Sequence, residues 1–233
     1  MSDKNKTTGA DLPFKHASEK DAAAFNLQPH LVGMMLEEPF YAKMLRILTK
    51  NKTRQIPTAG VISKEGDLIM YWNDRFMAAL EGKHVRGVLK HEMLHLVFEH
   101  TTTRKYEPHK VWNYATDLAI NSHLMDELPS FGLFPGRASR PLSDEQKKKM
   151  GADSVKRYEV VSAKIESFPV GQPAEWYFAQ LMEDDEVKNA IDNEDKGGKS
   201  LAEALRDGDV KFDDDGNLVD ADGNPVDIVP GTG

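Results

Sequence analysis

His91-Glu92-Met93-Leu94-His95 is the most informative segment of this chain, because it indicates both a helix and a chemistry. A His-Glu-x-x-His run on a helix is the usual pattern by which a protein holds a catalytic zinc ion. Each helical residue turns about 100°, so histidines four positions apart share one face and can reach one ion. A neighbouring carboxylate can take a proton from water that the metal activates and pass it to a leaving amine. The motif predicts His91 and His95 as metal ligands and Glu92 as the general base.

The residues around the motif predict an amphipathic helix. Val85, Leu89, Met93 and Leu96 recur at helical spacing, on the side of the helix opposite the two histidines. Such a stripe can pack on a sheet while the histidine face lines a cleft. An ordinary surface helix with solvated histidines would have the same stripe, so this helix alone does not decide between the two interpretations.

A second predicted helix, over about residues 111 to 124, offers a third ligand. Asn113, Asp117 and Asn121 are spaced by four and form a polar line among bulky apolar side chains. Burying these groups is costly unless they find partners or an ion. A catalytic zinc held by two histidines needs about one more protein ligand, and we expect Asp117 to be that ligand. The alternative is that the three residues only bond neighbouring backbone.

His100 is the alternative third ligand. It lies nine residues after His91, which on a continuous helix is about 180° away, within the apolar stripe. Zinc enzymes with a third histidine just beyond this motif usually break the helix with glycine, and no glycine occurs between His95 and His100. We therefore expect His100 to point away from the site, at the helix C-terminus, where it can bond the last carbonyl groups.

Several segments together resemble one known family: PTAGV at 57–61, VLKHEMLHLVFEH at 88–100, Arg104, WNYATDLAIN at 112–121 and AEWYF at 174–178. They are similar to the "putative metallopeptidase domain" of bacteria and phages, which often precedes a von Willebrand factor A-like domain. The resemblance covers about residues 20 to 185. It implies zinc on His91, His95 and Asp117 and catalysis by Glu92. The chain stops soon after this region, so we expect no A-like domain.

The remaining patterns predict an α+β fold, zincin-like and mostly helical, with a small sheet or hairpin packed on the metal helix. Apolar runs at 59–63 and 68–72 flank a turn and predict the hairpin. Its exposed edge could bind substrate as an added strand, or it could be core sheet only. A helix over 39–48 is expected to turn Phe40, Met44, Ile47 and Leu48 inward. Helix caps are expected at Ser18, Asn73 and Ser143, the last with a capping box to Gln146.

Composition indicates one domain with appendages. The 233 residues are 39% hydrophobic, enough for one core. No cysteine is present, which excludes disulfides and thiolate-bound metal. Without an apolar signal core or membrane span, we expect a cytoplasmic protein or one released by lysis. We expect a flexible leader at 1–18, the metallopeptidase domain at 19–186 and an acidic, turn-rich tail at 187–233.

The last part of the chain is strongly acidic. Residues 183–233 hold 16 acidic and 5 basic residues, a net charge of -11, which leaves +3 of the total -8 for residues 1–182. This balance argues against nucleic acid as a partner and makes the tail a candidate site for a protein partner. Its Asp-Gly-Asn repeats do not form calcium loops, because Lys211 and Leu218 occupy the first ligand positions. They predict turns instead.

The sequence therefore predicts a zinc-dependent metallohydrolase, most simply a peptidase acting on peptides or proteins. The alternative is a metal-binding protein that acts as an interaction or assembly factor, with catalysis incidental. An intact Glu92 favours the enzyme, because metal retention alone does not require it. Tyr106, His109, Tyr114 and His123 are candidates for stabilising a developing oxyanion, and the residues alone do not rank them.

Overall fold

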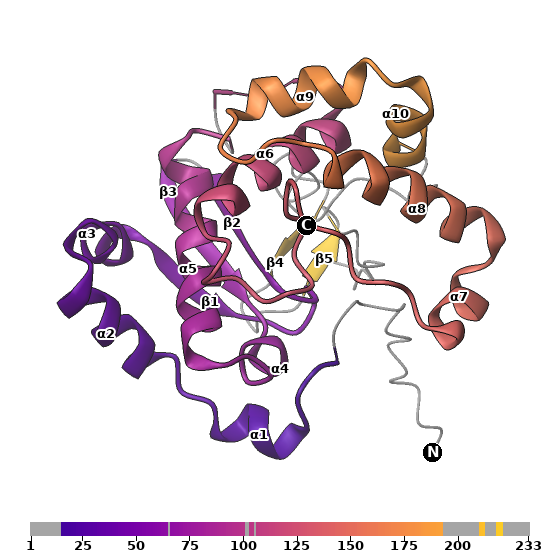
Figure 1. Cartoon of the computed structure of the whole chain (residues 1–233). Helices are drawn as coiled ribbons and strands as arrows, with labels where there is room; N and C mark the ends of the chain where they lie inside the picture. The colour runs from indigo at the N-terminus through magenta and orange to yellow at the C-terminus, as the bar shows by residue number, and fades with distance from the viewer. Residues whose placement is uncertain are drawn as a thin grey trace.

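The structure, a computed structural model, describes residues 15–64, 66–100, 103–104, 106–192, 210–212 and 218–220. Figure 1 shows how its elements are arranged. In chain order the described elements are α1 (Glu19–Ala24), α2 (Gln28–Glu37), α3 (Pro39–Ile47), β1 (Thr49–Lys52), β2 (Ala59–Lys64), β3 (Asp67–Trp72), α4 (Asp74–Met77), α5 (Gly82–Val97), α6 (His109–His123), α7 (Asp144–Met150), α8 (Ala152–Glu166), α9 (Ala174–Met182), α10 (Asp185–Asp192), β4 (Val210–Phe212) and β5 (Leu218–Asp220).

The main sheet has the strand order β1-β3-β2. The predicted hairpin is confirmed, because β2 pairs antiparallel with β3, from Ala59 opposite Trp72 to Lys64 opposite Asp67. On the other side, β1 runs parallel to β3. Strand β1 has the sequence TKNK, which lacks the apolar alternation by which half-buried strands are recognised, and it was not predicted. The order places β2 at an edge of the sheet.

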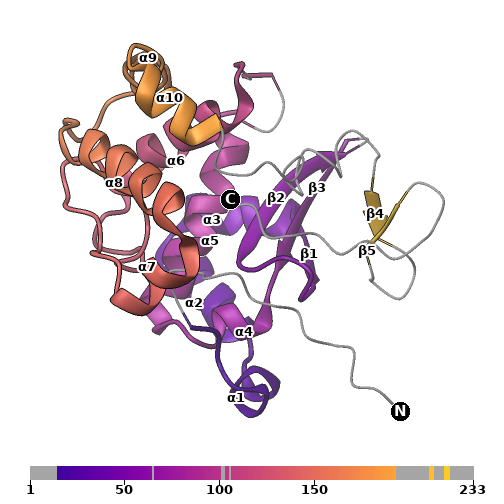
Figure 2. The same cartoon turned by 90° about the vertical axis from the view of Figure 1, so that its right-hand side faces the viewer.

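Helix α5 packs its apolar stripe against this sheet, as predicted. Val85, Leu89 and Met93 are at most 1% exposed and share a hydrophobic cluster with Val61 of β2 and Met70 of β3. Figure 2 shows α5 beside the sheet, with α6 and α8 farther from it on the same side. Burying each of these side chains stabilises the fold by about 1.5–3 kcal/mol, so the stripe fixes the rotation of α5 about its axis. The histidine face is consequently turned away from the sheet.

Helix α6 lies between two hydrophobic clusters. Its Ile120 belongs to the cluster under the sheet, whereas Val111, Trp112 and Leu118 belong to a second cluster formed with α8, α9 and α10. Helix α10 adds Val187 and Ile191 to this second cluster, and the expected border of the domain at residue 186 lies inside this helix. With its apolar faces occupied, α6 presents a remaining polar face to α5.

Local sequence signals predicted the helix boundaries better than they predicted which helix faces are buried. The caps predicted at Ser18, Asn73 and Ser143 are confirmed, the last with its full capping box. The inward face predicted for α3 is partly wrong, because Phe40 and Ile47 are 56% and 60% exposed. Met44 and Leu48 do pack on the core as predicted, and Leu45 packs there with them, where α3 contacts α2 and α5.

Two further findings concern the ends of the chain and membranes. Of the expected leader, residues 1–14 lie outside the described residues, as do the Asp-Gly-Asn turns expected in the tail. The strands β4 and β5 from that region pair antiparallel. Among the described residues, no helix has both the length and the apolar character needed to cross a bilayer. Helices and a small sheet together confirm the α+β class.

Candidate metal centre

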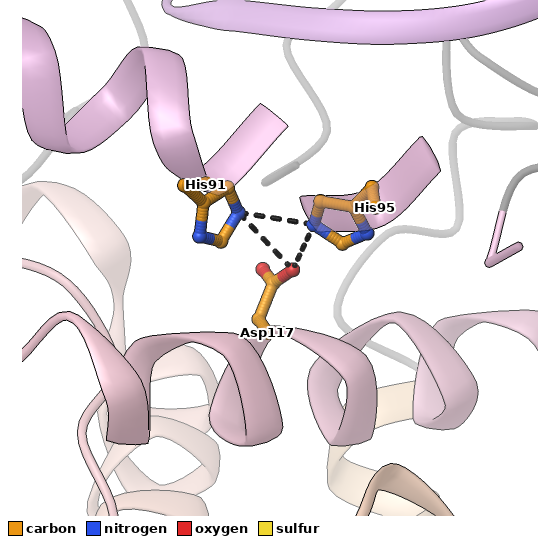
Figure 3. Close-up of side chains that lie close together, drawn as sticks. All are labelled: His91, His95 and Asp117. Atoms are coloured by element: carbon orange, nitrogen blue, oxygen red, sulfur yellow. Dashed lines mark hydrogen bonds and ion pairs between the residues drawn. The ribbon is translucent and has the colours of Figure 1, made fainter. Parts of the chain in front are cut away.

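Three side chains from α5 and α6 converge at one point, as Figure 3 shows. Nε2 of His91 lies 3.0 Å from Nε2 of His95. Oδ1 of Asp117 lies 3.6 Å from the first nitrogen and 3.1 Å from the second. The two histidines are one turn apart on α5, and Asp117 projects from α6 opposite them. The residues named from the sequence as a ligand set are therefore brought together.

This triangle has the size that a tetrahedral zinc site requires. With metal–ligand bonds of about 2.0–2.1 Å, neighbouring tetrahedral ligands are about 3.3 Å apart. The three observed separations, 3.0, 3.1 and 3.6 Å, bracket that value. Two imidazoles and one carboxylate are also ligands that zinc accepts. The side chains keep 15–22% of their surface exposed, so the group is not fully sealed from solvent.

The orientation of His91 is set by Asn121, one turn beyond Asp117 on α6. The side-chain N–H of Asn121 donates to the carbonyl of Leu133 at 2.7 Å, which directs its Oδ1 toward His91. That Oδ1 lies 2.8 Å from Nδ1 of His91 and accepts a hydrogen bond from Nδ1–H, because an amide oxygen cannot donate. In a neutral His91 imidazole, Nε2 therefore has the lone pair, on the side of the triangle. Outer partners of this kind orient metal-binding histidines in general.

Without a metal, the charges of His91, His95 and Asp117 favour the binding of a cation. Burial alone would raise the pKa of Asp117, but hydrogen bonds from His91 and His95 outweigh it and hold that pKa well below its usual range. Burial likewise opposes protonation of His91, yet the hydrogen bond and charge of Asp117 raise its pKa overall. The group of His91, His95 and Asp117 therefore attracts positive charge, which a divalent cation can supply.

Glu92 is a buried carboxyl group beside this cluster, only 8% exposed. Burial raises its pKa, and the charges of His91 and His95 offset part of the effect. The backbone N–H of Val61 in β2 also favours the ionised form and offsets part of the effect of burial. A carboxylate with a raised pKa is a stronger base than a solvent-exposed one, which suits the role of general base.

His100 does not point away, and this expectation from the sequence is wrong. Helix α5 ends at Val97, and Glu99 adopts a left-handed conformation with φ 59°. The N–H of His100 then bonds the carbonyl of His95 at 3.0 Å, and the N–H of Glu99 bonds that of Leu96 at 3.1 Å. This pair of bonds is a Schellman turn, here without glycine. It brings His100 back to His95, Nδ1 to Nδ1 at 3.4 Å, outside the group of three converging ligand atoms.

The four oxyanion candidates lie in different surroundings. Tyr106 is 44% exposed and packs on the ring of Trp112. His109, at the start of α6, pairs with Glu107 at 3.0 Å. His123 is exposed at the other end of α6, and Tyr114 packs against the second hydrophobic cluster. None of the four joins the converging ligand atoms.

The role of Asn121 was missed at the level of sequence. Its position in the polar line of α6 was noticed, but the only role considered for the asparagines was the alternative in which they bond neighbouring backbone. In the structure, the side-chain amide of Asn121 bonds a backbone carbonyl through its N–H and the ligand His91 through its Oδ1. The spacing Asp117-x-x-x-Asn121 was the available signal, because residues one turn apart on α6 can meet residues one turn apart on α5.

Comparison with known proteins is consistent with this geometry. An uncharacterised protein of Thermotoga maritima is 28% identical over 112 residues, which make up 46% of this chain and 28% of the relative. The match thus spans less than a third of the relative's length. No solved structure matches the chain. The family model described as "Putative metallopeptidase domain" matches residues 24–207, confirming the resemblance predicted from the sequence. Because this match spans well over half of the 233 residues, the chain belongs to that family.

Proposed function

We propose that the protein is a zinc-dependent metallohydrolase that cleaves peptide bonds. The observation that supports this most directly is the convergence of His91 Nε2, His95 Nε2 and Asp117 Oδ1 beside the buried Glu92. Three protein ligands with one open side are typical of catalytic zinc, whereas structural zinc is usually enclosed by four. The family description points to the same broad class.

Each residue has a distinct task in this proposal. His91, His95 and Asp117 hold the ion, which when bound activates water near neutral pH and polarises a carbonyl group. Glu92 takes the proton from the attacking water and passes it to the leaving nitrogen, which departs as an amine. Burial of Glu92 keeps this proton within the site during the transfer.

The position of β2 supports a peptide as the substrate. This strand is at an edge of the sheet and packs on α5, the helix that carries Glu92. An extended peptide that pairs with the outer edge of β2 would run alongside the metal helix, and its backbone would be held independently of its side chains. We expect such an enzyme to select extended or unfolded segments rather than folded domains.

The test compares metal content and cleavage in four proteins: wild type, Glu92→Gln, Asp117→Ala and His84→Gln. The substrate is casein with mass-spectrometric detection of the fragments. Glu92→Gln should keep its zinc and lose turnover by at least about 100-fold, since general-base catalysis contributes about 10²–10⁴-fold. Asp117→Ala should lose both zinc and turnover. His84→Gln, on α5 but outside the ligand group, should change neither.

Two results would refute the proposal. If the zinc-loaded wild type leaves casein and an unbiased peptide library intact, the peptidase activity is wrong, and the protein acts through binding. If Glu92→Gln cleaves as fast as wild type, the assigned general base is wrong. If Asp117→Ala keeps both its turnover and its full zinc content, Asp117 is not the third ligand.

A further inference from the structure

His95 needs a hydrogen-bond acceptor that the ligand group does not supply. Its Nε2 faces Asp117 Oδ1 at 3.1 Å and can bind a cation only through a lone pair. Neutral imidazole then carries its proton on Nδ1, which requires a partner, since half-buried N–H groups without one are costly. For His91 that partner is Asn121. For His95 the polar atom at Nδ1 is Nδ1 of His100, at 3.4 Å.

The surroundings of His100 suit an acceptor. The side chain of His100 is buried, with 8% exposure, and burial favours the neutral form of an imidazole. A neutral imidazole has one nitrogen lone pair, which can accept a hydrogen bond. The ring lies edge-to-face with Trp112 at 5.8 Å between centroids. Trp112 is fixed in turn, because its indole N–H donates to the carbonyl of Arg104 at 2.9 Å.

We propose that His100 is a positioning residue of the metal centre, which accepts a hydrogen bond from Nδ1–H of His95 and so directs the Nε2 lone pair of His95 toward the cation. The inference rests on the proposed function, because it assumes that His95 is a ligand. It gives each ligand histidine its own orienting partner: Asn121 of α6 for His91 and His100 of the turn after α5 for His95. His100 itself stays out of the ligand set.

The experiment measures zinc affinity by competition with a chromophoric chelator, on the full chain. His100→Phe keeps a ring of similar size against Trp112 but removes the acceptor. His100→Asn restores an acceptor, because its Oδ1 occupies about the place of the imidazole Nδ1. His84→Phe makes the same change on a histidine outside the site. We expect His100→Phe to bind zinc about 10- to 100-fold more weakly, and His100→Asn and His84→Phe to bind like wild type.

A second measurement reads the hydrogen bond directly. Nitrogen-15 NMR of the His95 imidazole in the zinc-loaded protein detects the proton on Nδ1. We expect the downfield Nδ1–H chemical shift of a hydrogen-bonded proton in wild type and in His100→Asn, and the loss of that downfield shift in His100→Phe. This readout does not depend on turnover, and packing alone would not change it. It also remains available in His100→Asn if His100→Phe fails to fold.

The outcomes separate this inference from the proposed function. If wild type binds no zinc, the proposed function fails, and the inference that rests on it fails with it. If wild type binds zinc and His100→Phe binds it equally well with an unchanged Nδ1–H signal of His95, only the positioning role is wrong. Loss of zinc binding in both His100→Phe and His100→Asn would make His100 a ligand and also overturn the inference.

Discussion

Gly87 is a position where one methyl group should disrupt the packing of α5 against the turn that follows α6. It lies in the interior of α5, one turn before His91. A Cβ added at Gly87 would be 2.2 Å from the backbone oxygen of Glu127 and 2.6 Å from its carbonyl carbon. The same turn is held by an ion pair from Lys90 to Glu127 at 2.5 Å. The neighbour is backbone, so no side chain can rotate to make room.

The magnitude follows from two opposing terms. Alanine is better than glycine in a helix interior by about 1 kcal/mol. An ordinary carbon–oxygen contact is about 1 Å longer than the 2.2 Å found here, and overpacking of this kind costs about 1–3 kcal/mol or more when backbone must move. We expect Gly87→Ala to destabilise the protein by about 2 kcal/mol. Gly33 in α2 is the matched control, because its Cβ would meet only the flexible Arg86 Nη1, at 3.5 Å. Gly33→Ala should stabilise by up to about 1 kcal/mol.

The assay is urea and thermal unfolding of both variants with a chelator present, followed by circular dichroism. For a chain of this size, about 2 kcal/mol lowers the melting temperature by about 4–8 °C, and the control should raise it by about 2–4 °C. Gly87→Ala should also weaken zinc binding, because α5 carries His91 and His95. The reasoning is refuted if Gly87→Ala is as stable as wild type or more so, or if the two variants shift in the same direction.

Four further outcomes are expected. Asn121→Leu should weaken zinc binding about 10- to 100-fold in the same chelator competition, with little change in the unfolding curve of the metal-free protein. Zinc at 100 times its dissociation constant should raise the free energy of unfolding by about 2.7 kcal/mol, an increase that chelator removes. Arg54 forms two hydrogen bonds to the buried Asp74, and these lower the pKa of Asp74 despite the opposing effect of burial. The ionised carboxylate of Asp74 therefore stabilises the fold above its unfolded pKa of about 3.9, and this stability is lost as pH falls toward the folded pKa. Arg54→Met should cost about 1–2 kcal/mol at pH 7, less than for a fully buried pair because Arg54 is 46% exposed. The urea unfolding curves of variant and wild type should converge in acid. Glu99→Val should destabilise by about 1–2 kcal/mol and weaken zinc binding, whereas Glu99→Gly should not, when both are followed by unfolding and zinc titration.

The parts of the site that could be predicted are those set by helical periodicity. His91 and His95 share a face because of their spacing, and the stripe through Val85, Leu89 and Met93 determines which way that face turns. Asp117 could be named because a carboxylate amid apolar side chains needs a partner. Each argument uses residues on one helix only. The meeting of the two helices followed from chemistry: a cation site needs about three ligands, and α6 offered the third.

The parts that could not be predicted depend on contacts between elements. The polar strand β1 exists because it pairs with β3, and its own sequence carries no strand signal. Phe40 and Ile47 have the spacing of an inward face, but the side of α3 that is covered depends on where α2 and α5 lie. The role of Asn121 depends on its hydrogen bond to the carbonyl of Leu133. No pattern within α6 predicts that bond.

His100 illustrates how a rule about residue type can mislead. The absence of glycine after His95 was taken to mean that the helix continues, which would carry His100 to the far side. A Schellman turn needs only one residue with positive φ, and a residue other than glycine can adopt it at a cost of about 1–2 kcal/mol. Glu99 does so while its carbonyl accepts from the N–H of Arg104 at 3.1 Å and its carboxylate accepts from the hydroxyl of Thr103. A few loop contacts are enough to offset that cost. The histidine that follows therefore approaches His95 from its Nδ1 side, where it can orient a ligand, and not from the Nε2 side, where it would be one.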